Sequence, residues 1–275
     1  MRRLIIGLTA ALVLVTACGP DGGTGTAAGG RTTGTAGATG TAGERPQAEA
    51  VRLDGAAEAS RKAGTAKFSV VLEADDGTGK VVASSGSGEL DFAGKKSKTE
   101  TTLGEQATIS VVIDGTTGYV RMAAEGAEQA PWLKMDLGAV FGAGGTDPSN
   151  YLTLLDGATD VREVGTETVH GKSTTHYAIV VDRAKLVEKM PEAKAFLESL
   201  GKLGDKVGVE VDTTLTPLPY EVWVDGDGLV HRITNDTKVT NDEGKEITVA
   251  STIEFTDYGA PVTITPPSDA ELGGR

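Results

Sequence analysis

The residues best suited to acid–base or metal chemistry in this chain are its histidines and its many carboxylates. His170 lies in a predicted turn, while His176 and His231 lie on predicted strands, where we expect ordinary surface exposure. No H-E-x-x-H pattern, G-x-S-x-G turn, Walker loop or dinucleotide-binding glycine pattern occurs. Catalytic groups can converge from distant positions. In the absence of any motif, however, we predict that the protein is not an enzyme and uses no cofactor.

A second candidate for metal chemistry is the run Asp225–Gly228, which reads Asp-Gly-Asp-Gly. A calcium loop that begins in this way needs an oxygen ligand at its fifth position and a glutamate at its twelfth. Leu229 and Asp236 occupy those positions. We therefore predict a hairpin turn here and no metal site.

Cys18 is the only cysteine, and its surroundings point to covalent lipid chemistry. It follows two arginines, an apolar run over Leu4–Val15 and two small residues. This order is typical of a secretory signal peptide, and the run is too short to span a bilayer permanently. Leu14–Cys18 resembles the bacterial lipobox, in which the signal is removed before the cysteine, which then receives a diacylglyceryl group. We predict a signal peptide over residues 1–17 and lipid attachment at Cys18.

Net charge and cysteine content restrict the partners and the source of stability. The formal net charge is −13, and removal of Arg2 and Arg3 with the signal peptide makes it −15. Nucleic-acid binding needs clustered Lys and Arg, so we predict no nucleic-acid partner. A lone cysteine excludes a disulfide framework, so stability must come from an apolar core.

The region after Cys18 differs in composition from the rest of the chain. Residues 19–44 are almost entirely Gly, Thr and Ala, with no hydrophobic period. Such a segment cannot bury enough apolar surface to offset its chain entropy. We predict a lipidated flexible tether over residues 18–45, with an end-to-end distance of roughly 30 Å. A single domain then follows over residues 46–275.

Three segments of this domain are predicted to be helical. Residues 47–63 are rich in Ala and Glu. Asp147, followed by a proline, is typical of a second helix start. Asp182 can cap a third, amphipathic segment that Pro191 breaks into a pair of short helices ending at Leu200.

Most of the remaining sequence alternates apolar and polar residues, which predicts strands with one apolar face. In residues 82–92, for example, the even-numbered positions from Val82 to Phe92 form one face. One amphipathic antiparallel sheet must cover its apolar face, and the helices are the available cover. We predict an α+β fold: a strongly curved antiparallel sheet, a half-barrel of about ten strands, with helices covering its concave face.

Five features follow one another in a distinctive order: the lipobox, the first helix leading into Ala66–Val70, the segment Pro131–Met135, the Asp147-Pro148 helix and the hairpin over Pro219–Val230. This order resembles that of the actinobacterial lipoproteins of the LppX/LprG type, which share the LolA-like fold. The likeness covers roughly residues 47–267. It implies a lipid-binding cavity between sheet and helices, and a role in carrying acylated lipids or lipoproteins away from the membrane.

A cavity for acyl chains needs a wide apolar lining with few polar groups. Met190 suits an adaptable lining, because thioether side chains conform to varied shapes. Trp132 fits two positions equally well, the mouth of the cavity and a cap over the core. The predicted lining residues are Phe68, Val70, Leu72, Leu90, Phe92, Ile109, Val111, Trp132, Leu152, Leu155, Leu186, Met190, Leu197, Val249, Ile253 and Phe255.

These features predict a monomeric carrier of acylated lipids or glycolipids. It would be anchored through Cys18 to the outer leaflet of the cytoplasmic membrane, with an envelope transporter as a further candidate partner. The helix pair over Arg183–Leu200 is its predicted lid. In the alternative, the same apolar residues fill a solid core, and the protein is a non-enzymatic cell-surface interaction or sensor module.

Overall fold

The computed structural model of the protein describes residues 45–104, 107–124, 130–136, 150–189, 216–240 and 245–273. The predicted signal peptide, Cys18 and almost all of the tether lie outside these residues, as do Asp147, Met190 and Leu197.

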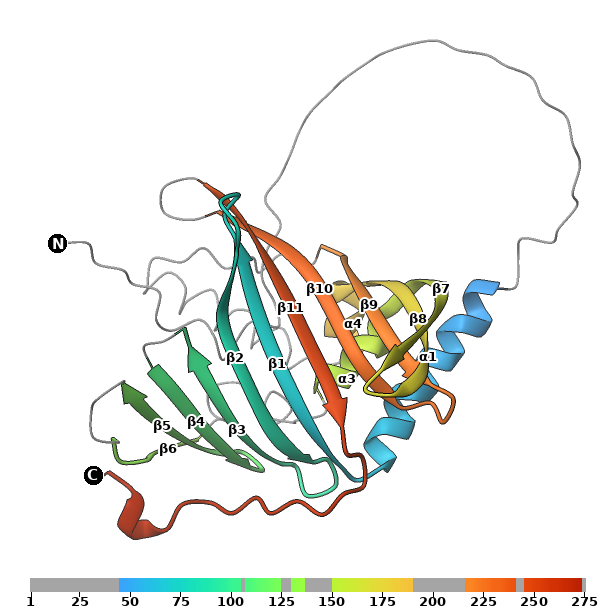
Figure 1. The fold of residues 1–275 in the computed structure, drawn as a ribbon. Helices are drawn as coiled ribbons and strands as arrows, with labels where there is room; N and C mark the ends of the chain where they lie inside the picture. Colours follow the sequence, from blue (N-terminus) through green and yellow to red (C-terminus); the bar gives the residue numbers. More distant parts are fainter. Residues whose placement is uncertain are drawn as a thin grey trace, which may run out of the picture.

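One sheet of eleven antiparallel strands makes up most of the described molecule (Figure 1). The strands are β1 (Thr65–Asp75), β2 (Lys80–Asp91), β3 (Lys96–Leu103), β4 (Ala107–Asp114), β5 (Thr117–Ala124), β6 (Leu133–Asp136), β7 (Ala158–Val169), β8 (Lys172–Val181), β9 (Leu218–Asp225), β10 (Val230–Thr240) and β11 (Glu246–Thr256). Their spatial order is β6-β5-β4-β3-β2-β1-β11-β10-β9-β8-β7. The chain thus forms two meanders, which join where the first strand pairs with the last.

The predicted large antiparallel sheet is confirmed, with eleven strands rather than about ten. β6 and β7 are its two edges, so the sheet is open. One predicted face is wrong, because the pairing of β1 with β2 shifts register between Leu72 and Glu73. Val82 therefore lies opposite Glu73 and is exposed, instead of sharing the face of Leu90.

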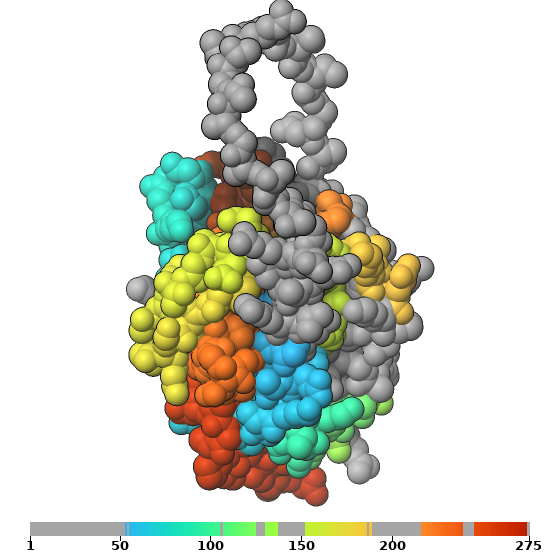
Figure 2. Space-filling view, turned by 90° about the vertical axis from the view of Figure 1, so that its right-hand side faces the viewer, coloured from blue at the N-terminus to red at the C-terminus, as the bar shows by residue number. Residues whose placement is uncertain are grey.

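Few helices accompany the sheet in the described part of the chain. They are α1 (Arg45–Lys62), α3 (Asn150–Thr153), α4 (Arg183–Lys189) and the 3₁₀ turns η1 (Leu154–Gly157) and η2 (Asp269–Glu271). The backbone N–H of Lys185 donates to Oδ1 of Asp182 at 3.1 Å, so Asp182 caps α4 as predicted. α1 packs beside β7 and β10, and Figure 2 shows it next to the β9–β10 hairpin. There the backbone N–H of Val230 donates to Oγ of Ser60 at 3.0 Å.

The core lies where α1, α3 and η1 pack on β7–β11 and on the adjoining parts of β1 and β2. Leu53, Ala56 and Ala57 of α1 are fully buried in it. That helices cover the rest of the concave face stays a prediction. The sheet residues of the core include Phe68, Leu90, Val161, Tyr177, Ile179, Val222, Val224, Val230, Ile233, Ile253 and Phe255.

After β11 the chain runs back along the base of the sheet to the edge formed by β6 (Figure 1). The backbone N–H of Trp132 donates to the carbonyl oxygen of Glu271 at 3.0 Å, and Gly273 N–H donates to the carbonyl oxygen of Trp132 at 2.8 Å. Leu272 thereby forms a parallel bridge with Trp132. The tail therefore occupies part of the edge next to β6, where backbone groups would otherwise be unpaired.

Candidate functional site

Strand register shows which residues share the face of the sheet that carries the core. Side chains alternate between the two faces, and directly paired residues lie on the same face. Phe68 of β1 is paired with Phe255 of β11 and with Gly88 of β2. We call this the inner face. From Gly88 the same row continues through Thr99, Val111, Val120 and Leu133 to the β6 edge.

The inner face near this edge carries exposed apolar side chains. Met122 is 43% exposed, Leu133 59% and Met135 39%. Ile109 is paired with Met122, and Gly118 with Met135, so these residues share the inner face. Scattered exposed hydrophobic residues are ordinary, but a contiguous group on one sheet face marks an interaction surface. We call Ile109, Val111, Val120, Met122, Leu133 and Met135 the open patch.

Seven of the predicted lining residues lie in the core instead. Their side chains are at most 8% exposed and belong to one cluster with the buried residues of α1. A packed core that also contains residues of α1 is therefore their observed environment, and a role in lining a ligand cavity stays a prediction. The seven are Phe68, Leu90, Phe92, Leu152, Leu155, Ile253 and Phe255.

The other predicted lining residues are divided between several places. Val70 is half-buried and packs against the core. Leu72 and Ile109 are buried outside the core cluster, while Val111 and Val249 are half-buried. Leu186 is part of α4, and Met190 and Leu197 lie outside the described residues. Of the predicted set, only Ile109 and Val111 are in the open patch.

Trp132 lies on the opposite face from the open patch. Its neighbour Leu133 is on the inner face, and alternation directs the indole to the outer face. There the guanidinium carbon of Arg121 lies 4.6 Å from the centroid of the indole ring. A cation over an aromatic face is a favourable arrangement. The indole is buried among the edge strands and the tail, not beside Met122 and Leu133.

Four members of the open patch are not among the residues predicted from the sequence: Val120, Met122, Leu133 and Met135. The available signal was alternation, since Val120–Met122 and Leu133–Asp136 both alternate apolar with polar residues. Alternation alone does not say which face points inward. That assignment follows from pairings across β2–β6, which the sequence does not contain.

Asp225–Gly228 forms the predicted hairpin turn. Oδ1 of Asp225 accepts hydrogen bonds from the backbone N–H groups of Asp227 and Leu229, at 3.0 and 2.9 Å. Oδ2 of Asp225 lies 2.8 Å from Nε2 of His231. Burial by itself would raise the pKa of Asp225, but these hydrogen bonds outweigh it and lower the pKa. Within the described residues, no group of three or more His, Cys, Asp or Glu could hold a metal ion.

The expected exposure of two histidines is wrong. His231 is buried beside Asp225, and His176 is buried on the outer face, where it stacks on Trp223 with ring centroids 4.2 Å apart. Nδ1 of His176 lies 3.0 Å from Oε1 of Glu167. Neighbouring strands bring rings and carboxylates together here, so the histidines pack instead of pointing into water.

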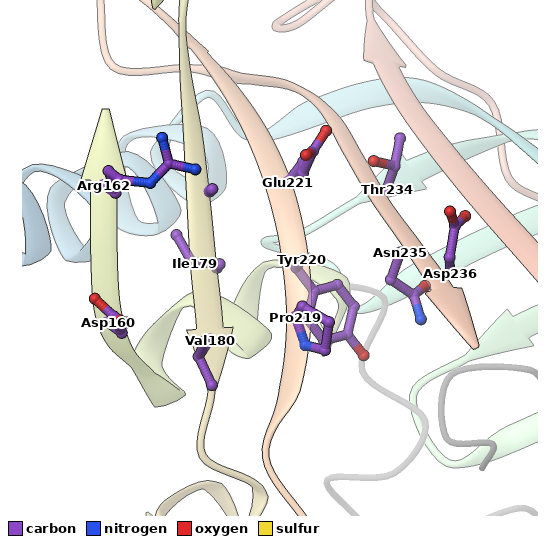
Figure 3. Close-up of a pocket in the computed structure, with 11 residues that line it drawn as sticks. Asp160, Arg162, Ile179, Val180, Pro219, Tyr220, Glu221, Thr234, Asn235 and Asp236 are labelled. Carbon is purple, nitrogen blue, oxygen red and sulfur yellow. The ribbon is translucent and has the colours of Figure 1, made fainter. Parts of the chain in front are cut away.

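A pocket of about 460 Å³ lies among β7, β8, β9 and β10 (Figure 3). None of the predicted lining residues lines it, and it is separate from the open patch. Its polar rim contains Asp160, Arg162, Glu221 and Asp236. No helix of the described residues has the length and apolar character needed to cross a membrane.

A model of a family described as a family of unknown function, DUF7537, matches residues 3–268. The chain is also 29% identical over 152 residues to an uncharacterised 31.2 kDa protein of Streptomyces griseus, from the rplA–rplJ intergenic region. That match covers 51% of this chain and 47% of the other protein. The chain thus spans about half the length of the curated relative that it matches.

The fold is similar to that of lipoprotein LppX from Mycobacterium tuberculosis, with a TM-score of 0.50 and 16% identity. The likeness covers 80% of this chain and 99% of LppX. LprF from Mycobacterium bovis gives a TM-score of 0.48 at 10% identity, over 81% of this chain and 98% of that one. The likeness to LppX confirms the predicted LppX-type fold.

Proposed function

The chain belongs to the DUF7537 family of unknown function, and we propose that it is a non-enzymatic, lipid-binding protein of the cell envelope. The observation that carries this proposal is the open patch. Met122, Leu133 and Met135 together expose apolar surface on the face that elsewhere carries the core. Solvated apolar surface of this kind is stabilised when an apolar partner covers it.

An acyl chain has suitable chemistry for the open patch. Burial of each methylene group contributes about 0.8 kcal/mol, without any requirement for directed polar contacts. The two methionines can adapt to chains of different shape. A chain that leaves a bilayer gives up a similar apolar environment, so transfer between membrane and protein is close to neutral. A carrier needs this balance, because it must release what it binds.

The sequence supplies the finer parts of the proposal. A signal peptide over residues 1–17, lipid attachment at Cys18 and a tether over residues 18–45 would hold the domain at the outer face of the cytoplasmic membrane. The acyl chain would pass from the open patch into an apolar cavity between sheet and helices. The segment Arg183–Leu200 would act as its lid, and Leu186→Asp should then reduce lipid retention while leaving the sheet folded.

A second candidate is a cell-surface interaction or sensor module. It is favoured by the seven predicted lining residues that are buried in the core. In that case the open patch binds a protein partner, and no lipid is carried.

Native mass spectrometry of purified protein tests these proposals. The protein would lack the signal peptide and carry Cys18→Ser, so that any lipid detected is bound non-covalently. We expect the protein with Cys18→Ser as its only substitution to retain lipid. The same protein with the further changes Met122→Asp and Leu133→Asp should lose it. Val164→Asp is the matched control, because Val164 is a 47% exposed apolar residue on β7, away from the open patch.

Urea unfolding of the same proteins establishes that loss of lipid does not reflect loss of the fold. Lipid retained at the wild-type level by the double variant would contradict the role of the open patch. Absence of lipid from every protein, together with a specific protein partner that the double variant fails to bind, would favour the interaction module.

A further inference from the structure

Ser84 of β2 carries a buried hydroxyl group that makes no hydrogen bond. The residue is 1% exposed, and among the described residues its Oγ has no hydrogen-bond partner. Buried side-chain hydroxyls nearly always have a partner, because an unpaired polar group loses its hydration without compensation. An alanine at this position would avoid that loss. The packing of the described residues therefore gives no reason for a serine here.

A β-bulge keeps this hydroxyl on the inner face. Ser84 is paired with Leu72 of the inner face, and beyond this pair the register shifts, so that Ala83 has no partner on β1. Val82, on the far side of the bulge, is 53% exposed. A bulge changes the direction of side chains locally, and bulges are common next to functional sites. The shift therefore sets the buried Ser84 apart from the exposed end of β2.

The inner face leads from the open patch to Ser84 along one row of paired residues. Gly86, which follows Ser84 on this face of β2, is paired with Thr101 of β3. Thr101 is paired with Ile109, and Ile109 with Met122, both of which belong to the open patch. Exposure falls along this row from 43% at Met122 to 8% at Ile109 and 6% at Thr101. The row thus connects solvated apolar surface with the buried hydroxyl.

Two further hydroxyl groups lie on the inner face around Ser84. Leu72, which is paired with Ser84, is paired on its other side with Ser251 of β11, a residue that is 7% exposed. Oγ1 of Thr101 lies against Gly86, because a Cβ atom on that glycine would be 2.6 Å from it. We call Ser84, Thr101 and Ser251 the hydroxyl site.

The strands around the hydroxyl site present no charged side chain to it. Among the described residues, the inner-face positions of β1, β2, β3 and β11 are all apolar residues, glycine, serine or threonine. Burial of an ionised group without an opposite charge is strongly unfavourable, whereas a neutral acceptor needs only a hydrogen-bond donor. The hydroxyl site therefore favours a neutral acceptor over a carboxylate or a phosphate.

We propose that the Ser84 hydroxyl donates a hydrogen bond to the carbonyl oxygen of an acyl ester whose hydrocarbon chain lies on the open patch. A hydroxyl group has one proton to donate, and an ester carbonyl accepts it without carrying a charge. A free fatty acid would instead bring an ionised carboxylate to an uncharged face. This inference rests on the proposed function and adds which part of the lipid the protein recognises.

Competitive native mass spectrometry tests the inference on the chain without its signal peptide and with Cys18→Ser, after removal of co-purified lipid. The probes are palmitoyl lysophosphatidylcholine, an ester, and hexadecyl lysophosphatidylcholine, an ether, in equal amounts below their micelle concentrations. They share head group and chain length, but only the ester has a carbonyl oxygen. We expect the ester to bind about tenfold more tightly, equivalent to about 1.4 kcal/mol, and Ser84→Ala to abolish this preference.

Ser87→Ala is the matched control, because Ser87 is a serine of the same strand on the outer face, where it is paired with Ser69 and Glu100. This variant should keep the preference for the ester. Urea unfolding of the lipid-free proteins gives a second readout. Ser84→Ala should be at least as stable as the parent protein, because the fold loses no hydrogen bond. A loss of stability would show that the hydroxyl already has a partner, and would overturn the inference.

Failure of this inference and failure of the proposed function give different results. Equal binding of ester and ether, lost for both in Met122→Asp/Leu133→Asp, overturns the role of Ser84 and leaves acyl-chain binding by the open patch in place. An ester preference that persists in Ser84→Ala also overturns that role. Binding of neither lipid overturns the proposed function together with the inference.

Palmitate tests the argument from charge. It has the same acyl chain as the ester probe but carries an ionised carboxylate at neutral pH. We expect it to bind more weakly than palmitoyl lysophosphatidylcholine. Binding as tight as that of the ester would show that the inner face accepts a carboxylate, and would overturn the assignment of a neutral carbonyl to the hydroxyl site.

Discussion

The two ends of the inner face have the same alternating pattern but different surroundings. On β9–β11 the inward residues Val222, Val230 and Phe255 are buried in the core to which α1 contributes. On β5 and β6 the inward residues Met122, Leu133 and Met135 are exposed. We call the first the closed region and the second the open region. Alternation therefore specifies an apolar face, whereas the elements that pack on it decide whether it becomes core or binding surface.

Small residues separate the two regions. Between them the inner face of β2 and β3 carries Gly86, Gly88, Thr99 and Thr101 in directly paired positions. The ring of Phe68 occupies the space over Gly88, where a Cβ atom would lie 2.6 Å from it. A Cβ on Gly86 would lie 2.6 Å from Oγ1 of Thr101. These four positions of β2 and β3 thus carry no side chain larger than threonine, and they lie between the core and the open region.

The largest difference between the regions should appear in stability. Phe255→Ala removes a fully buried ring from the closed region, and we expect a loss of about 3–5 kcal/mol. Leu133→Ala in the open region should change stability by less than about 0.5 kcal/mol. Urea unfolding followed by circular dichroism measures both. Equal losses would mean that the open region is packed in solution.

A second prediction concerns the small residues that separate the closed region from the open region. A Cβ on Gly88 would collide with the carbonyl oxygen of Lys98 as well as with the ring of Phe68, so Gly88→Val should cost about 1–3 kcal/mol. Gly165→Ala on β7 is the control, because nothing lies within 4 Å of its added Cβ. Thermal unfolding compares the two variants. If they are equally stable, close approach at Gly88 does not define the boundary.

A third prediction uses pH to test how the closed region holds its hairpin. The lowered pKa of Asp225 means that the native state favours the carboxylate, so this stability is present above the ordinary value of 3.8 and is lost as pH falls through the lowered native value. We expect Asp225→Asn to cost about 1–2 kcal/mol at neutral pH. The difference from wild type should shrink below about pH 4.

Chemical unfolding at a series of pH values measures this dependence. Asp227→Asn, on the same turn but with an exposed side chain, serves as the control. A difference between wild type and Asp225→Asn that stays constant down to pH 2 would show that the hydrogen bonds do not favour the ionised form.

Local features of the fold were predictable from the sequence because their causes are local. The first helix was expected over residues 47–63 and is observed over Arg45–Lys62. The His170-Gly171 turn has both residues at positive φ, 49° and 76°, between β7 and β8. Asp225 forms its turn through bonds to residues two and four positions later. Each of these depends on neighbours in the chain.

The candidate site was less predictable, because it depends on distant pairing. Phe255 and Leu133 both belong to apolar, alternating segments, and nothing in those segments says which one α1 will cover. Val82 changed face because of a single register shift between Leu72 and Glu73. The pocket of Figure 3 lies where the pairing of β9 with β10 ends, beyond Glu221 opposite Thr234, and only the register reveals that point.

The smallest expected effect on stability is at the outer edge of the open region. There the tail pairs with Trp132 beside β6, and no core packs on the strand. Ser268 Oγ lies 2.6 Å from Oε2 of Glu271, and Ser268 N–H donates to the same oxygen at 2.9 Å. This capping box forms η2 and places Glu271 and Gly273 against Trp132. We expect Ser268→Ala to change global stability by no more than about 0.5 kcal/mol.

Hydrogen exchange at the Trp132 amide should nevertheless become faster, because that N–H bonds only to the tail. Ser268→Thr keeps the hydroxyl and should preserve the protection. If exchange at the Trp132 amide is unchanged in Ser268→Ala, the pairing of the tail with Trp132 does not depend on η2. A global loss like that of Phe255→Ala would place the tail in the same cooperative unit as the closed region, and the two regions would then unfold as one.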